Sequence, residues 1–181
     1  AWTPIDSDYF VKAAQKALDE NVDLFLTIFQ TGGVAVTSGV TGLTAAMVKS
    51  TIALENLKRN NIVTIAIASS KTTGGPYASA FFNHELLGIE SSTSTNILFS
   101  GKRVSKIAQS DPLPEDFGDA TRVQKAGLVD FVLNNRNEIR DTVLTLTKIL
   151  KKKNDIEIKN DLENSSSEKL EEPLSSSSKA V

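Results

Sequence analysis

The sequence predicts an α/β fold built from repeated strand-helix units, and three features support this. Two apolar runs, Asp23–Phe29 and Ile62–Ala68, are each followed closely by a glycine pair, Gly32-Gly33 and Gly74-Gly75. A helix-like stretch comes after each pair. The second run is almost continuously apolar, which is typical of a parallel strand covered on both faces. Because the carboxyl ends of parallel strands meet at one edge of a sheet, we expect both glycine pairs to lie there.

Hydrophobic spacing predicts the helices in order along the chain. Phe10, Ala14 and Leu18 recur at helical spacing, and a similar pattern follows the first glycine pair after a flexible loop at Val34–Gly42. Pro112 and Pro114 interrupt the chain before a partly helical stretch. The expected helices are Asp6–Glu20 with a cap at Ser7 or Asp8, Leu43–Asn60 with a cap at Thr44, Gly75–Phe82, Val104–Gln109, part of Glu115–Gly127, and Arg136–Lys153.

Short apolar runs between these helices predict three further strands. They are Leu86–Glu90, Asn96–Phe99 and Leu128–Leu133. Together these elements form one domain over residues 1–153. From 154 to 181 the chain is rich in Ser, Lys and Glu, with too few apolar residues to offset the entropy of ordering it, which predicts a disordered tail. The alternative for the tail is a short helix at Glu168–Glu172 that docks on a partner.

Composition excludes several classes of function. The net charge of -2 gives no reason to expect nucleic acid or a membrane as partner. The chain has no cysteine and one histidine, His84, so we expect no bound metal and no Ser-His dyad. No apolar run approaches the length of a membrane span, and the chain is expected in the cytoplasm or the plastid stroma.

The glycine pairs are the candidate catalytic residues. Glycine lets a ligand approach the main chain closely, and backbone N–H groups at the start of a helix can stabilise a negative oxygen, as in an oxyanion hole. Neither pair has the spacing of a phosphate-binding loop. His84 is expected to have an ordinary polar or partly exposed role. Gly101, Lys102 and Arg103 are either a solvated helix start or a contact to a phosphate-bearing cofactor.

Five segments in this order resemble the β subunit of the acetyl-CoA carboxylase carboxyltransferase, within the crotonase-like superfamily. The resemblance covers about residues 10–150, and TTGGPYASAFF is its most specific part. The segments are TGGVAV at Thr31–Val36, TTGGPYASAFF at Thr72–Phe82, ILFSGKRV at Ile97–Val104, LPEDF at Leu113–Phe117 and KAGLVDFVL at Lys125–Leu133.

The resemblance implies a crotonase/ClpP-like spiral of β-α units and transfer of a carboxyl group from carboxybiotin to acetyl-CoA, giving malonyl-CoA. The four glycines would polarise the thioester and the biotin ureido group through backbone N–H groups. Gly101, Lys102 and Arg103 would contact CoA. The implied partners are a carboxyltransferase α subunit, other carboxylase subunits and a biotin carrier protein.

The chain also departs from the family. Ala35-Val36 replaces an Arg-Met pair, Asn83-His84-Glu85 replaces a polar Gly-Asp, and the zinc ribbon with its cysteine pairs is absent. The early strands of the family precede Ala1, so we expect the domain to be N-terminally incomplete and other polypeptides to cover its exposed sheet edges. Two hypotheses stay open: a working carboxyltransferase subunit, and a catalytically silent structural subunit of a larger assembly. A related enzyme that acts on another acyl-CoA is a third.

Overall fold

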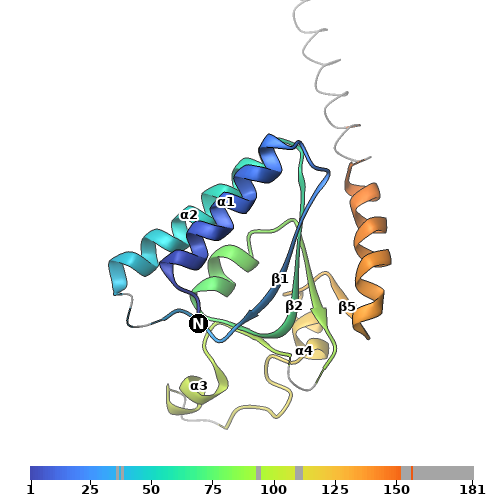
Figure 1. Cartoon of the computed structure of the whole chain (residues 1–181). Helices are drawn as coiled ribbons and strands as arrows, with labels where there is room; N and C mark the ends of the chain where they lie inside the picture. The colour runs from blue at the N-terminus through green and yellow to red at the C-terminus, as the bar shows by residue number, and fades with distance from the viewer. Residues whose placement is uncertain (36, 38, 93–94, 109–111, 152–155, 157–181) are drawn as a thin grey trace, which may run out of the picture.

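The computed structural model shows a parallel sheet with helices on both faces (Figure 1). It describes residues 1–35, 37, 39–92, 95–108, 112–151 and 156, with the backbone alone at 41 and 42. The tail predicted from residue 154 falls outside the described residues, except for Ile156. Within the described part, no helix is long and apolar enough to cross a membrane.

Five strands form the sheet in the order β1-β2-β3-β5, and β4 pairs with the far end of β2. All of these pairings are parallel. The strands are β1 (Leu24–Thr31), β2 (Val63–Thr73), β3 (Leu86–Glu90), β4 (Ile97–Leu98) and β5 (Phe131–Leu133). Every strand predicted from the sequence is therefore present. β2 runs five residues beyond its apolar part because its polar end pairs with Thr31 of β1 and with β4.

The helices also follow the prediction, with shifted ends. They are α1 (Pro4–Asp19), α2 (Val40–Arg59), the π-helix η2 (Tyr77–Phe81), α3 (Lys102–Ala108), α4 (Ala120–Lys125), the 3-10 helix η3 (Arg136–Glu138) and a last helix that is described over residues 139–151. The predicted cap of α1 is wrong: Thr3 caps it in a capping box with Asp6. Ser7 instead points inward and donates to Ala46 O over 2.6 Å, which ties α1 to α2.

The start of α2 also differs from the prediction. The helix begins at Val40 with Gly39 as its N-cap, and Thr44 lies inside it and donates to Val40 O. Thr44 therefore satisfies a carbonyl within the first turn instead of capping the helix.

Two hydrophobic cores lie on opposite faces of the sheet. One face packs against α1, α2 and η2, with Phe10, Phe29 and Phe81 buried between them. The other face packs against the helix at 139–151 through Ile65, Ile67 and Val143. β2 contributes to both cores, which explains why its first six residues, Val63–Ala68, are apolar except for Thr64.

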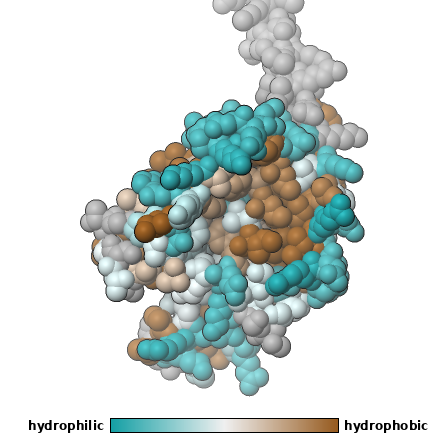
Figure 2. Space-filling model, viewed as in Figure 1, coloured by the Kyte–Doolittle hydropathy of each residue, from teal (hydrophilic) through white to brown (hydrophobic). Residues whose placement is uncertain are grey.

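The edge of the sheet at β1 is only partly covered. β1 is an end strand, and its side chains Leu26 and Ile28 are 37% and 53% exposed. Figure 2 shows hydrophobic side chains gathered on this face, between β1 and the helix at 139–151, where Ile149 is also exposed. A contiguous apolar surface of this kind is typical of a contact with another polypeptide.

Candidate functional site

The structure brings the two glycine pairs into contact. Their strands, β1 and β2, are parallel neighbours with Thr31 aligned to Thr72, so both turns leave the same end of the sheet. A Cβ placed on Gly74 would lie 3.4 Å from the Cα of Gly33. Both residues have left-handed backbone angles, with φ of +114° at Gly33 and +71° at Gly74. This close approach and these angles are the physical reason for glycine at the two positions.

The first turn is held by the N-terminal segment and by its own strand. Trp2 N–H donates to Gly33 O over 2.7 Å, and Ala35 N–H donates to Trp2 O over 2.8 Å. Gly33 N–H donates to the Thr31 hydroxyl over 3.3 Å. Gly32, in contrast, is exposed, and a Cβ added there would meet no atom of the described residues within 4 Å. The surface above Gly32 is therefore open to a ligand.

The second turn is enclosed. Gly74 N–H is shared between Leu98 O at 3.2 Å and Phe99 O at 3.0 Å. A Cβ on Gly75 would come within 2.9 Å of both Met47 Sδ and Val34 Cγ1. Gly75 and Pro76 then open the helical segment that continues as η2, and Ser79 Oγ donates back to Gly75 O over 2.8 Å. A π-helix at this point is of the kind found at functional sites.

Three backbone donors around the two turns have no hydrogen-bond acceptor in the part of the chain that the structure describes. Among the described residues, no acceptor hydrogen-bonds to the N–H groups of Gly32, Val34 or Gly75. Unpaired N–H groups in a half-buried turn can stabilise an oxygen that becomes negative during a reaction. Of the four predicted glycine donors, those of Gly33 and Gly74 are engaged and those of Gly32 and Gly75 are available. Val34 is a donor that the sequence reasoning missed.

The side chains that enclose the second turn were also missed. Met47 comes from α2 and Val34 from the loop after β1, so neither stands near Gly75 in sequence. An ordinary apolar residue carries no local signal that it will contact a turn almost thirty residues away. Only the packing of α2 against the two strands brings Met47 to this place.

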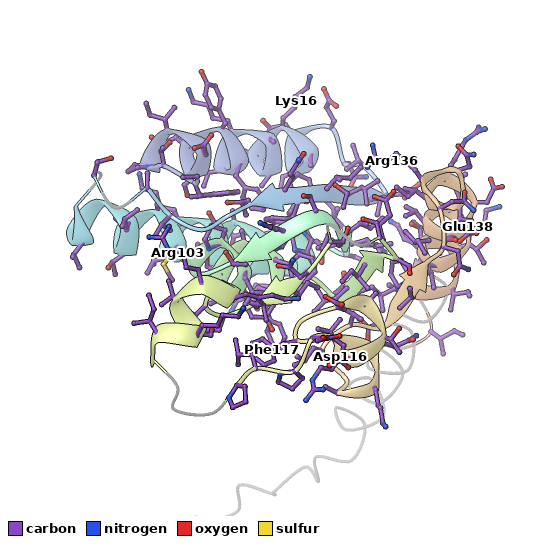
Figure 3. All side chains as sticks on the ribbon, turned by 90° about the horizontal axis from the view of Figure 1, so that it is seen from below. Lys16, Arg103, Asp116, Phe117, Arg136 and Glu138 are labelled. Carbon is purple, nitrogen blue, oxygen red and sulfur yellow. The ribbon has the colours of Figure 1, made fainter. Side chains whose placement is uncertain are left out.

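The basic segment after β4 divides into two parts. The ammonium group of Lys102 lies 3.3 Å from both Asp119 Oδ1 and Glu115 O, so it fastens α3 to the loop before α4. Arg103 also lies on α3 (Figure 3), is exposed, and has no ion pair with the described residues. Gly101 adjoins Phe99 and Ser100, and its carbonyl accepts from Val104 and Ser105 N–H. Arg103 is thus the more accessible cation of the predicted pair.

His84 is buried and hydrogen-bonded, so of the expected ordinary polar or partly exposed role only the partial exposure is wrong. Its ring is 6% exposed and lies against Phe10, Phe25 and Phe29. Nδ1 is 3.1 Å from Phe81 O, and Nε2 is 3.1 Å from Thr27 Oγ1. A carbonyl only accepts, so Nδ1 carries the proton and Nε2 accepts from the Thr27 hydroxyl.

Burial lowers the pKa of His84 from 6.5 to about 4, because the charged ring would lose its hydration. His84 is therefore neutral at physiological pH. It joins β1, which leads to the first turn, to the end of η2, which follows the second. This is a positioning role in the core, since the imidazole does not reach the surface of the glycine turns.

Comparison with known proteins shows which proteins this chain is similar to. No family model matches the chain. The chain is 31% identical over 149 residues to acetyl-CoA carboxylase carboxyl transferase subunit beta of Pelagibacter ubique, which covers 82% of this chain and 47% of that protein. It is also 30% identical over 142 residues to the carboxyl transferase subunits beta/alpha of Natranaerobius thermophilus, covering 78% of this chain and 23% of that protein. The chain is a homologue of the carboxyltransferase β subunit.

Solved structures show that this carboxyltransferase homologue has the crotonase fold. It matches a Pseudomonas malonate decarboxylase hetero-dimer with a TM-score of 0.67 at 19% identity, covering 82% of this chain and 65% of that one. It matches transcarboxylase 12S, solved with methylmalonyl-coenzyme A bound, with a TM-score of 0.65 at 19% identity, covering 81% of this chain and 28% of that one. The predicted α/β fold of repeated β-α units is thus confirmed.

Two further facts concern the length of the carboxyltransferase homologue and its possible metal ligands. The chain spans about half the length of the curated β subunits that it matches. The described residues contain no group of three or more His, Cys, Asp or Glu that could hold a metal ion.

Proposed function

We propose that this chain is a carboxyltransferase subunit that moves a carboxyl group from carboxybiotin to acetyl-CoA and forms malonyl-CoA. The observation that supports this most directly is the contact between Gly33 and Gly74, with unused N–H groups at Gly32, Val34 and Gly75 around it. Homology to carboxyltransferase β subunits supports the same reaction.

The mechanism requires no side-chain nucleophile. One unused N–H group would polarise the thioester carbonyl and stabilise the enolate that forms when the methyl group loses a proton. Another would hold the ureido oxygen of biotin as carboxybiotin gives up its carboxyl group to the enolate carbon, and the ureido nitrogen freed in this way would accept the proton. A donor of this kind is worth about 3 kcal/mol in the transition state. Gly32 and Gly75 are the proposed donors of the catalytic set, and Gly33 and Gly74 hold the two turns together. Gly101, Lys102 and Arg103 are the proposed CoA contacts, with Arg103 the freest of the three.

A protein partner is part of the proposal. One curated relative is a fused beta/alpha carboxyl transferase, and the malonate decarboxylase neighbour is a hetero-dimer. The exposed apolar side chains of β1 fit a surface that another polypeptide covers. We propose that a carboxyltransferase α subunit supplies the other half of the site and that a biotin carrier protein delivers the carboxybiotin.

One observation favours the alternative, a catalytically silent structural subunit. The N–H groups of Gly33 and Gly74, two of the four glycine donors, already donate to acceptors of this chain. A site that had lost its substrates would keep these packing interactions and need nothing else.

The test is biotin-dependent conversion of malonyl-CoA to acetyl-CoA by the chain purified with its native partners. Gly32→Val adds a side chain in open space and keeps the N–H group, so it should leave folding unchanged and block the approach of substrate. A substrate that cannot reach the N–H group loses the same interaction as when an oxyanion donor is removed. We therefore expect turnover to fall about 100-fold or more. Ala13→Val, on the exposed face of α1, is the matched control and should keep full activity.

The two hypotheses give different results in this assay. No exchange from an intact complex that contains the wild-type chain would establish the silent subunit. Exchange that survives Gly32→Val would show that the turns are not the site.

A further inference from the structure

An apolar cavity lies beside Leu98 and Phe99, the residues that hydrogen-bond to the glycine turn at 74–75. It has a volume of about 320 Å³ and is open to the surface. Its walls come from η2, from β4 with Phe99, and from the region around α4. The main lining side chains are Tyr77, Leu98, Phe99, Phe117, Val123 and Leu128.

This cavity shares its wall with the candidate site. The carbonyl groups of Leu98 and Phe99 accept the hydrogen bond of Gly74 N–H, while the same two residues line the cavity. Tyr77 lines it from the other side and stands two residues after Gly75. The cavity therefore adjoins the second turn through Leu98 and Phe99 at the end of β4 and through Tyr77 on the helical segment that Gly75 opens.

The lining determines what chemistry fits. Its one charged group is Arg122, which is paired with Asp116 at 3.0 Å at the solvent edge. Buried amide or phosphate groups would lose their hydration here and find few partners, which is costly. A pantetheine arm or a nucleotide is therefore disfavoured, and an alkyl chain is favoured. The volume corresponds to about ten water molecules, far more than the single methyl group of an acetyl unit.

We propose that this cavity receives the acyl chain of a CoA thioester longer than acetyl. The inference rests on the proposed function, since the thioester carbonyl must lie at the glycine turns for its chain to enter. If the acyl chain binds here, then Tyr77, Ala126 and Leu128, which line the cavity, determine which acyl chains fit.

The experiment measures the dissociation constants of acetyl-, propionyl-, butyryl- and hexanoyl-CoA for the complex purified with its native partners. We expect affinity to rise about fourfold for each added methylene, the value for burying one such group. Ala126→Phe places a ring at the exposed rim of the cavity, so it should abolish this gain and leave acetyl-CoA binding within twofold. Ala13→Phe, equally exposed but on α1, should leave the whole series unchanged.

Each other outcome overturns the proposal. A flat series in the wild type, with acetyl-CoA still bound and exchanged, would refute the acyl cavity and leave the proposed function standing. An Ala126→Phe variant that keeps the wild-type series would refute it as well. If Ala126→Phe instead releases a partner subunit, the cavity binds that subunit and not an acyl chain. If no acyl-CoA binds the intact complex, the proposed function fails too.

Discussion

Gly32-Gly33 and Gly74-Gly75 each follow a parallel strand, yet their surroundings differ. Gly32 lies on the exposed side of an end strand, with nothing within 4 Å of an added Cβ. Gly75 lies between Met47 and Val34, with contacts of 2.9 Å. The difference arises because β1 is at the edge of the sheet and β2 is in its middle. The first Gly-Gly pair is therefore accessible at Gly32, whereas the second is packed against neighbouring side chains at Gly75.

His84 connects the strand before the first turn to the helix after the second, through Thr27 and Phe81. Its removal therefore has the largest expected effect on stability. His84→Ala removes a buried ring and its hydrogen bonds to Thr27 and Phe81, and should lower the free energy of unfolding by about 3 kcal/mol. Urea denaturation monitored by far-UV circular dichroism measures this change. Thr27→Val removes only one hydrogen bond and should cost about 1 kcal/mol. Equal losses in the two variants would mean that the ring itself contributes nothing.

The same residue predicts a pH dependence of stability. The pKa of His84 is about 4 in the folded state and 6.5 in the unfolded state, so between these values the unfolded chain binds more protons. Stability is therefore full above pH 6.5 and falls as pH drops toward 4, by at most about 1.4 kcal/mol per pH unit. Urea midpoints measured between pH 7.5 and 4.5 test this. A His84→Gln variant should lose much of the slope, and an unchanged slope would assign it to carboxylates.

A side chain added at each turn should change stability by a different amount, because Gly75 is tightly packed and Gly32 is exposed. Gly75→Val must displace Met47 and Val34, and overpacking of this kind costs about 2 kcal/mol. Gly32→Val meets no neighbour and should change stability by less than about 0.5 kcal/mol. Thermal unfolding of both variants measures the contrast. If both are equally destabilised, the first turn is not open.

The smallest effects are expected in the basic segment beside the second turn. Lys102→Ala breaks a partly exposed ion pair with Asp119 and should change stability by about 0.5 kcal/mol or less. It should leave CoA affinity nearly unchanged, whereas Arg103→Ala should weaken CoA binding several-fold without a stability change. Isothermal titration with CoA distinguishes them. The reverse order of affinities would make Lys102 the phosphate contact.

Sequence periodicity predicted most of the fold because each element has a local cause. The almost continuous apolar run at Ile62–Ala68 predicts a strand buried on both faces, and the spacing of Phe10, Ala14 and Leu18 predicts an amphipathic helix. The limits of elements were predicted less well. β2 continues into polar residues because β1 and β4 supply hydrogen-bond partners there, and no local pattern reports such partners.

The sequence alone predicted two strand-Gly-Gly-helix units, and the absence of cysteine and the single histidine led to the hypothesis that their chemistry rests on backbone donors. The motif order also identified the carboxyltransferase resemblance. Only the tertiary structure decided which glycine N–H groups are engaged, because that depends on acceptors such as Leu98 O and Thr31 Oγ1. It also decided that His84 is a buried, neutral group, because burial and pKa are set by neighbours that are distant in sequence.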